Sequence, residues 1–296
     1  MAGKLLSVLD NLSSDRPVLI AGPTASGKSA YALEIASRFG GVIINADALQ
    51  VFANWHVLTA RPSRDEESVA EHHLYGHVDG EFPYSVGQWL RDITPLLSSG
   101  QRPIVVGGTG LYFTALTEGL ADIPDTKPEI RELADKRLSL EGPQVLLSEL
   151  DRQTATRIDP LNPVRIQRAW EVLNSTGRGL ASWQDVTPPA LLPLGETETL
   201  LLDADKDWLS DRIERRFDGM VANGALEEAR LNLENWDPTR PSSKAIGAPE
   251  LVAHLRGEMT IEQARDQAKI ATRQYAKRQR TWFRSRMKAW RQISLP

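Results

Sequence analysis

The stretch LIAGPTASGKSA, residues 19–30, decides the fold of this chain. Its core, Gly22-Pro23-Thr24-Ala25-Ser26-Gly27-Lys28-Ser29, fits the phosphate-binding pattern Gly-x-x-x-x-Gly-Lys-Ser at every position. The glycines let the backbone curl so that successive N–H groups meet phosphate oxygens, while Lys28 adds a charge and Ser29 can ligate Mg²⁺. The loop predicts a bound phosphate, but it leaves open whether that phosphate belongs to a nucleotide or to a diphosphate attached to carbon.

Apolar runs around this loop predict an α/β fold. Residues 18–21 form a short apolar run before the loop, and SAYALEIASRFGG after it predicts a helix that stops at Gly40 and Gly41. GVIINAD predicts a buried strand ending on Asp47, and RPIVVGG predicts another at residues 104–106. Apolar strands that alternate with helices indicate a P-loop NTPase-like parallel sheet wrapped by helices.

Three segments of the chain differ in character. Residues 1–119 hold the loop and these strands, and we expect them to form the first part of a P-loop catalytic core. Residues 120–195 favour helices and are interrupted by prolines, which predicts a helical insertion domain. Residues 196–296 begin with the strand-like TETLLLDAD, and we expect them to complete the core and end in a basic helix.

The net charge of −4 hides an asymmetry. Residues 267–296 carry nine Lys or Arg and no acidic residue, whereas the other 266 residues carry 26 basic and 39 acidic groups. Such a basic end predicts a polyanionic partner. The absence of cysteine excludes disulfides and thiolate zinc sites. No span of about twenty apolar residues occurs, so we expect a cytoplasmic protein without a membrane partner.

The basic end has a helical pattern. At about 100° per residue, six cations fall on one stripe: Arg273, Lys277, Arg280, Arg284, Lys288 and Arg291. The aromatic residues fall on the opposite side: Tyr275, Trp282, Phe283 and Trp290. A helix with its aromatic side on the core would present these cations outward.

Asp47 and Thr109 follow two of the predicted strands, at the carboxyl edge where open α/β sheets bind ligands. Asp47 there fits a general base or a magnesium ligand, and it fits equally the N-cap of a helix starting at Ala48. Thr109 would reach the same edge or cap the helix that follows it. The residues alone leave these alternatives open.

Other polar residues favour structural roles on local sequence. His72 and His73 point in different directions and lack partners at metal-ligand spacing, which favours a structural or substrate-loop role. Arg212 and Arg216 share a helix face, which fits a diphosphate, but a solvated face paired with nearby acids is favoured. The strand PIVVGG ends in glycine, not in the magnesium-binding Asp of most hydrolysing P-loop proteins, which weakens an ATPase interpretation.

Taken together, these blocks resemble the tRNA dimethylallyltransferase family, also called tRNA isopentenyltransferase, from about Arg16 to Arg286. The matching blocks follow the family's order: GPTASGKS, INADALQVF, TARP, HHL, VGGTGLYF, DPLNPVRIQRAWEV, DRIERRFDGM, AIG and KRQRTWFR. The family transfers a dimethylallyl group from its diphosphate to N6 of adenosine 37, just 3′ of the anticodon, in tRNAs that read codons beginning with U. The resemblance implies that tRNA and dimethylallyl diphosphate are substrates and that Mg²⁺ is a cofactor.

The resemblance gives the site residues specific roles. The P-loop from Gly22 to Ser29, with Arg212, would hold the diphosphate as the leaving group, and Ser29 would ligate Mg²⁺. Asp47 would act as the general base on N6. Thr109 would contact the adenosine or the diphosphate.

The resemblance also implies a set of tRNA contacts, and we expect the protein to be a monomer. Chemistry on a stacked base requires its extrusion into a pocket, where the Gln50 amide would lie near it. The anticodon stem-loop would be held by Ala48, Leu49, Gln50, Arg131, Val164, Arg165, Ile166, Gln167, Arg168, Lys244, Gly247, Lys277, Arg280 and Arg284.

The chain departs from the family pattern at five positions. The family's Ser and Tyr in the Asp block are Ala48 and Phe52 here, and its Thr-Ala-Lys-Pro has Arg61. The Gln of its Asn-Pro-Gln-Arg is Val164, and the Tyr after Ile-Gly is Ala248. The predicted base, loop, Thr and Arg positions are intact, so the departures bear on base contacts and tRNA preference rather than on the reaction.

Three alternatives compete with tRNA prenylation. A P-loop small-molecule kinase shares the loop and its context but does not account for the basic end. A nucleotide-switched RNA-binding protein has no need of Asp47 and Thr109 at the sheet edge. An adenylate isopentenyltransferase would act on free AMP or ADP, which offers too few phosphates to occupy the insertion and the basic helix.

Overall fold

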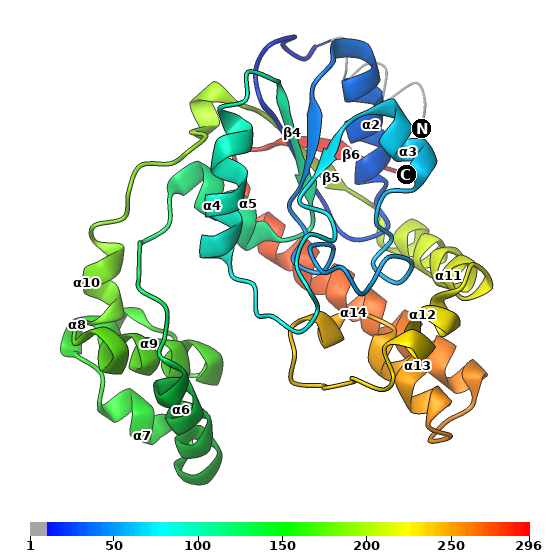
Figure 1. The fold of residues 1–296 in the computed structure, drawn as a ribbon. Helices are drawn as coiled ribbons and strands as arrows, with labels where there is room; N and C mark the ends of the chain where they lie inside the picture. The colour runs from blue at the N-terminus through cyan, green and yellow to red at the C-terminus, as the bar shows by residue number, and fades with distance from the viewer. Residues whose placement is uncertain (1–10) are drawn as a thin grey trace. The chain divides into compact units, whose positions relative to one another are not determined.

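The computed structural model describes residues 11–296, so the first ten residues of the predicted 1–119 segment lie outside the described part. Six strands form one parallel sheet in the order β3-β2-β4-β1-β5-β6 (Figure 1). The strands are β1 (Val18–Ala21), β2 (Val42–Asn45), β3 (His72–His73), β4 (Pro103–Gly107), β5 (Glu198–Asp203) and β6 (Arg291–Ser294). The sheet confirms the predicted α/β, P-loop-like fold.

Helices cover both faces of this sheet. The helices of the sheet unit are α2 (Lys28–Phe39), α3 (Arg64–Val69), α4 (Val86–Leu97), α5 (Gly110–Glu118), α11 (Lys206–Ala222), α12 (Ala225–Leu231), α13 (Ala248–Leu255) and α14 (Ile261–Arg286), with the short turns η1 (Leu194–Glu196) and η2 (Ser242–Lys244). Of these, α12 and α13 pack with the end of α11 and the start of α14 rather than on the sheet. Because side chains alternate along a strand, Val18 and Ile20 of β1 pack on the face of α2 and the start of α11. Leu19 and Ala21 pack on the opposite face with α4 and α5.

The central strand brings the predicted site elements to one edge of the sheet. In β1, Leu19 pairs with Val105 of β4 on one side and with Thr199 of β5 on the other. The strand β2 pairs with β4 in turn. The carboxyl ends of β1, β2 and β4 therefore lie together, and they carry the P-loop, Asp47 and Thr109.

Helix α14 links two parts of this unit. Its Ala264 and Ala268 pack in an apolar cluster with α13 and the end of α11, and its Phe283 packs against the sheet. The expected stripe of six cations on one helix is wrong beyond Arg286, where α14 ends. The chain turns at Met287 to bury Trp290, and it then forms β6 beside β5. Lys288 and Arg291 therefore lie outside the helix.

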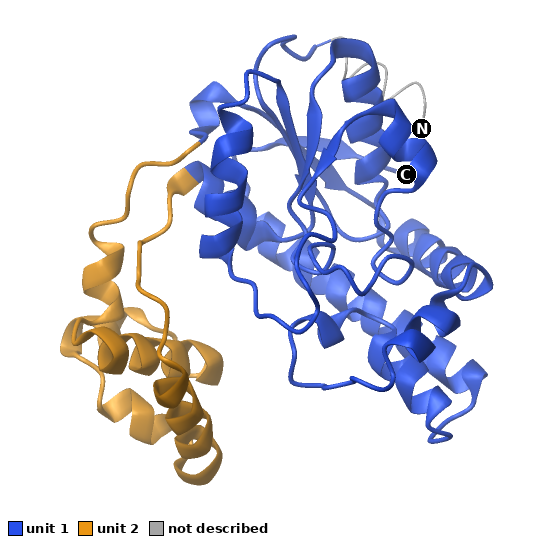
Figure 2. Cartoon of the chain, in the orientation of Figure 1, with its two compact units in different colours: residues 1–117, 192–296 blue, residues 118–191 orange. Residues whose placement is uncertain are grey.

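Residues 118–191 form a second compact unit made of helices, drawn in orange in Figure 2. The helical insertion was expected at residues 120–195, and the segment from Leu192 onward belongs to the sheet unit, where its N–H donates to the Leu116 carbonyl at 3.0 Å. The helices are α6 (Pro128–Glu141), α7 (Pro143–Ser148), α8 (Arg152–Arg157), α9 (Pro163–Thr176) and α10 (Leu180–Gln184). Three of the prolines start helices, where a missing N–H costs nothing. Ile166 and Trp170 lie at the centre of this unit's core.

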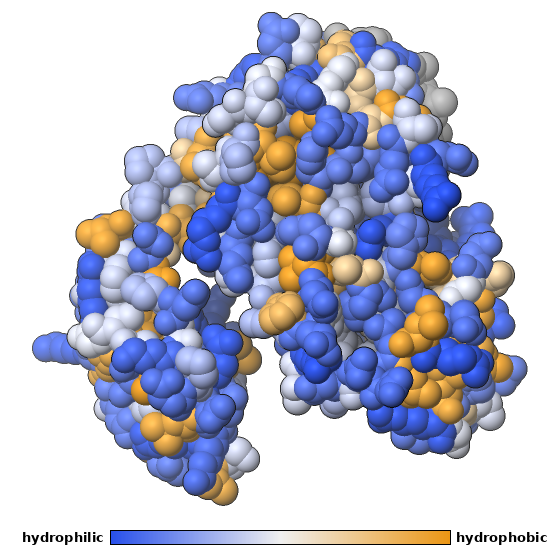
Figure 3. All heavy atoms as spheres, in the orientation of Figure 1, coloured by the Kyte–Doolittle hydropathy of each residue, from blue (hydrophilic) through white to orange (hydrophobic). Residues whose placement is uncertain are grey.

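The surface is mostly polar. In Figure 3 hydrophilic residues cover most of the visible face, with smaller hydrophobic patches among them. Within residues 11–296, no helix has the length and apolar character needed to cross a membrane.

Candidate active site

The P-loop lies between β1 and α2 and is curled for anion binding. Ala25 and Gly27 have φ values of 63° and 94°, so both residues are in the left-handed region, a conformation that occurs in anion-binding loops. Helix α2 begins at Lys28 and adds the partial positive charge of its N-terminus. A Cβ on Gly22 would lie 3.0 Å from Leu202 and 3.1 Å from the Ser26 hydroxyl, which explains glycine there.

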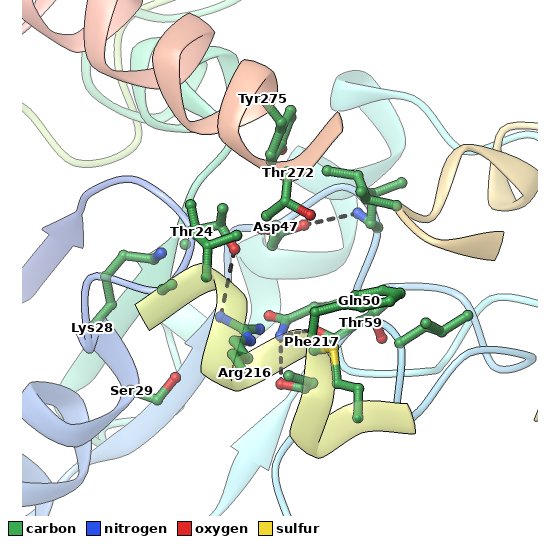
Figure 4. A pocket seen from close by; sticks show the side chains of 18 of the residues that line it. Thr24, Lys28, Ser29, Asp47, Gln50, Thr59, Arg216, Phe217, Thr272 and Tyr275 are labelled. Carbon is green, nitrogen blue, oxygen red and sulfur yellow. Dashed lines mark hydrogen bonds between the residues drawn. The ribbon is translucent and has the colours of Figure 1, made fainter. Parts of the chain in front are cut away.

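A cavity of about 270 Å³ opens in front of this loop, and Figure 4 shows its lining side chains. One part of the lining is polar and includes Lys28, Ser29, Asp47, Gln50, Arg212 and Arg216. Another part is apolar and includes Leu58, Tyr75, Phe217, Met220 and Ile246. The cavity can therefore hold a molecule that joins an anionic group to an apolar or aromatic one.

Lys28 bonds to the backbone of its own loop. Its ammonium donates to the Pro23 carbonyl at 3.0 Å. Burial lowers the pKa of Lys28 from 10.5 to about 8, and the negative charge of Asp47 partly opposes this shift. The ammonium therefore loses its proton at a lower pH than that of an ordinary lysine, and an anion in the cavity would favour the charged form.

Two arginines of α11 bind the loop from the other side. Arg212 donates to the Ala25 carbonyl at 2.7 Å, and its guanidinium stacks 4.7 Å from the centre of the Trp208 ring. Arg216 contacts the Thr24 hydroxyl at 3.4 Å (Figure 4), and burial lowers its pKa. The solvated-face interpretation of this pair is wrong, because both side chains line the cavity and neither forms an ion pair within residues 11–296.

Arg216 is the site residue that sequence reasoning set aside. The signal was present, since a residue four positions from Arg212 lies on the same helix face. What the sequence did not show is that this face turns toward the P-loop. Thr272 and Tyr275 of α14 also line the cavity, although Tyr275 had been assigned to the core side of that helix.

Asp47 and Thr109 come together across the sheet edge. The Asp47 carboxylate accepts from the Leu49 N–H at 3.0 Å, and no helix starts at Ala48, so the helix-cap alternative is wrong. The Thr109 hydroxyl accepts from the Ala48 N–H at 2.9 Å, and the Thr109 N–H donates to the Ala46 carbonyl at 3.1 Å. These two bonds brace the turn that carries Asp47. Thr109 itself is not among the cavity-lining residues.

Gln50 lines the cavity, but the donor half of its amide is already used. Its Nε2 donates to the carbonyls of Thr59 and Ala60, at 2.9 Å each. Ala48 and Leu49 are half-buried beside it. The amide thus fixes the shape of the loop over residues 50–60.

The structure corrects two predicted tRNA contacts. Ile166 is fully buried in the helical core, so its side chain cannot reach RNA. Gly247 is buried at the N-terminus of α13 with a φ of 96°, and a Cβ there would lie 2.7 Å from Phe217. This glycine is required by packing and backbone conformation.

The other predicted contacts in the helical unit vary in exposure. Arg131, Val164 and Arg165 are exposed. Gln167 donates to Asp135 at 2.6 Å, and Arg168 bonds to the Thr126 hydroxyl. The first three are free to meet RNA, whereas the last two hold neighbouring residues of their own unit.

The cations of α14 differ in their surroundings. Lys269 pairs with Asp218 at 2.8 Å, and Arg273 pairs with Glu214 at 3.0 Å, so α11 neutralises both. Lys277 and Arg284, like Lys244 on η2, are exposed. Arg280 is only half-exposed, and its Nε is buried without a hydrogen-bond partner, so this side chain does not project outward as expected.

The two neighbouring histidines belong to the sheet. His72 pairs in register with Ile43, and its Nδ1 lies 2.8 Å from the Ala70 carbonyl. The His73 ring lies 3.0 Å from the Glu71 carboxylate. No group of three potential metal ligands of the His, Cys, Asp or Glu type occurs in the described part of the chain.

Comparison with known proteins identifies close relatives. The IPP transferase family model matches residues 50–286, and the isopentenyl transferase model matches residues 16–75. The tRNA dimethylallyltransferase of a Cereibacter sphaeroides strain is 61% identical over 95% of this chain and 97% of its own length. The tRNA dimethylallyltransferase of a Ruegeria species is 60% identical over 97% of this chain and 98% of its own length.

Solved structures share the fold. The tRNA isopentenylpyrophosphate transferase of Bacillus halodurans superimposes with a TM-score of 0.67 at 31% identity, covering 95% of this chain and 90% of that one. A eukaryotic dimethylallyltransferase acting on tRNA superimposes with a TM-score of 0.80 at 25% identity, covering 95% of this chain and 74% of that one.

Proposed function

Because the chain belongs to the IPP transferase family and is a tRNA prenyltransferase, we propose that it transfers a dimethylallyl group from dimethylallyl diphosphate to N6 of adenosine 37, 3′ of the anticodon. One observation carries the proposal. A single cavity combines three cations at the P-loop with one carboxylate, Asp47. The cations suit an anionic leaving group, and the carboxylate suits a proton acceptor.

The transfer follows from this arrangement. The N6 lone pair forms a bond to the allylic carbon while the bond from that carbon to the diphosphate oxygen breaks. The diphosphate leaves with the electron pair, and Lys28, Arg212 and Arg216 neutralise its growing charge. Asp47 accepts the N6 proton, which makes a poorly nucleophilic amine reactive.

We assign Thr109 a role through Asp47. Its hydroxyl holds the Ala48 N–H, so it sets the position of the turn from which the carboxylate projects. The departure from the family pattern at Ala48 leaves this contact intact, because the contact uses the backbone. The apolar part of the cavity lining, which includes Phe217 and Met220, suits the prenyl group or the base.

The donor set also fits Mg²⁺. The Ser29 hydroxyl at the start of α2 lines the cavity, and it offers a hard oxygen atom of the kind that this ion prefers beside phosphate oxygens. When bound, Mg²⁺ would supply further positive charge to the diphosphate oxygens. The role proposed for the three cations stands beside this charge and does not depend on it.

The anticodon stem-loop is the proposed tRNA element. Exposed cations on α14 and η2 suit its phosphates, and Arg131, Val164 and Arg165 suit contacts by the helical unit. We propose that the enzyme acts as a monomer in the cytoplasm, where its tRNA substrate is. A small-molecule kinase or an adenylate prenyltransferase is not favoured, because the full-length relatives at about 60% identity are tRNA enzymes.

The deciding experiment is incubation of the full chain with unmodified tRNA, Mg²⁺ and dimethylallyl diphosphate. Nucleoside mass analysis is expected to show a five-carbon addition to one adenosine, accompanied by release of diphosphate. A transcript with guanosine in place of adenosine 37 serves as the control and should give no product. Product from AMP but not from tRNA, or ATP consumption with a small acceptor, would overturn the proposal.

A further inference from the structure

Gln279 of α14 is a buried amide in an otherwise basic and largely exposed stretch of helix. Only 6% of its surface is exposed, whereas Lys277 and Arg278 just before it are exposed. Its side chain does not bond within its own helix. The Oε1 atom accepts from the Thr24 N–H at 2.8 Å, and the Nε2 atom donates to the Gly108 carbonyl at 2.9 Å.

These two bonds join the two halves of the candidate site. Thr24 belongs to the P-loop, where the leaving group is expected, and Gly108 precedes Thr109, which braces the Asp47 turn. A single planar amide therefore spans the gap between them. A backbone N–H on one side and a carbonyl on the other require an acceptor and a donor in one side chain, and glutamine supplies both.

The glycines on either side of Thr109 pack tightly against α14. A Cβ on Gly108 would lie 2.2 Å from the Gln279 Nε2 and 3.2 Å from the Asp47 Oδ2. A Cβ on Gly110 would lie 2.2 Å from the Trp282 ring of the same helix. The turn of Thr109 is thus pressed against α14, and the proposed base lies against the same glycine as the amide.

We propose that Gln279 is a positioning residue for prenyl transfer. It sets the spacing between the P-loop, which holds the diphosphate, and the Thr109 turn, which holds Asp47. This inference rests on the proposed function. Reacting atoms need to lie about 3–3.5 Å apart, and a misplacement of about 1 Å can cost on the order of 100-fold in rate.

The first test is Gln279→Leu in the full chain, compared with Gln274→Leu on the exposed side of the same helix. Rates of tRNA prenylation are divided by the concentration of sites that bind inorganic pyrophosphate in calorimetry, so that only folded protein counts. We expect kcat of Gln279→Leu to fall about 100-fold. The KM for tRNA and the pyrophosphate affinity should change less than about threefold, and Gln274→Leu should match the wild type.

The variant Gln279→Glu tests whether the hydrogen bonds of this side chain matter, rather than its volume alone. An ionised carboxylate can accept from Thr24, but it repels the Gly108 carbonyl, so kcat should fall at neutral pH. A protonated carboxyl restores both the donor and the acceptor. The rate of this variant relative to the wild type should therefore rise as the pH falls, whereas the relative rate of Gln279→Leu should stay flat.

The outcomes separate cleanly. Retention of kcat within threefold in Gln279→Leu, or loss of pyrophosphate binding in parallel with kcat, would overturn the positioning role. A flat relative rate for Gln279→Glu across pH would overturn it too. Absence of product with the wild-type chain would instead overturn the proposed function.

Discussion

The cations of the cavity and three arginines of the helical unit are held in opposite ways. Around the P-loop, Lys28, Arg212 and Arg216 bond to backbone carbonyls or a hydroxyl, and none forms an ion pair within residues 11–296. In the helical unit three arginines pair with carboxylates: Arg137 with Glu141 and Glu149, Arg157 with Asp185, and Arg168 with Glu171.

The difference separates charges that await a ligand from charges that serve the fold. Gathering half-buried cations without carboxylate partners is unfavourable, because desolvation and mutual repulsion both act against it. Such a cluster is tolerated where an anion completes it. Surface arginines with partners add little stability each and need no ligand. Removal of a cation at the cavity should therefore affect activity, whereas removal of one of these paired arginines should leave activity intact.

The largest effect is expected for Asp47→Asn. Asp47 is the one carboxylate among the described residues that line the cavity, and the asparagine keeps its shape while losing its basicity. General-base catalysis contributes about 10²–10⁴-fold, so single-turnover prenylation should slow by that factor. Asp65→Asn on the exposed first turn of α3 is the matched control. Full activity of Asp47→Asn would remove the carboxylate from the mechanism.

The next effect is expected for Arg216→Met beside Arg215→Met. The two arginines are neighbours on α11, but Arg216 lines the cavity while Arg215 is exposed. Loss of one preorganised donor to the leaving group should cost about 100-fold in kcat. The melting temperature of the free protein should rise, because repulsion within the cation cluster is relieved. A lower melting temperature with normal kcat would mean that Arg216 serves the fold.

The pH dependence should report on Lys28. Its ammonium is charged below its pKa of about 8 and binds the diphosphate in that state. The kcat/KM for dimethylallyl diphosphate should therefore fall about tenfold per pH unit above 8 as the charge is lost. Lys28→Arg keeps its charge through this range, so its profile should lack the inflection even at a lower absolute rate. An identical inflection in that variant would assign the titration to another group.

The sequence predicted the local parts of the site and missed the parts made by distant packing. The P-loop and Asp47 were predictable because their geometry depends on a few adjacent residues: glycines for the turn and the end of an apolar strand. Gln279 was not, since it bonds to Thr24, 255 positions away. Arg216 was misassigned for the same reason, because only the tertiary fold shows which face of α11 meets the loop.

The errors at the C-terminal end of α14 and within α9 have a physical cause as well. A run of cations at helical spacing continues through Lys288, but the burial of Trp290 and the pairing of β6 with β5 end the helix earlier. The block around Ile166 matched a known motif as a continuous string. On a helix, however, such a string alternates between the surface and the core, and Ile166 faces the core.

A smaller effect is expected on α14, where the two kinds of cation occur on one helix. Removal of the exposed pair, Lys277→Ala with Arg284→Ala, should weaken tRNA binding roughly tenfold at 0.1 M salt and flatten its salt dependence. Removal of the paired cations, Lys269→Ala with Arg273→Ala, should lower the melting temperature and change tRNA affinity less than about twofold. Filter binding over a salt series measures both. Equal losses of tRNA affinity in the two double variants would show that the cations paired with α11 contact RNA as well.

The smallest effect on activity is expected for Arg137→Met in the helical unit. Arg137 bonds to Glu141 and Glu149 and lies 5.5 Å from the Trp170 ring centre, so its loss should lower the melting temperature of the full chain while kcat stays within about twofold.

Arg137 holds the pKa of Glu149 below its ordinary 4.5. The stability from this pair is therefore fully present above pH 4.5 and is lost as the pH falls through the lower, folded-state pKa. The melting difference between variant and wild type should accordingly shrink as the pH drops below 4.5. A difference that persists at low pH would mean that Arg137 stabilises the unit through packing on Trp170 rather than through its charge.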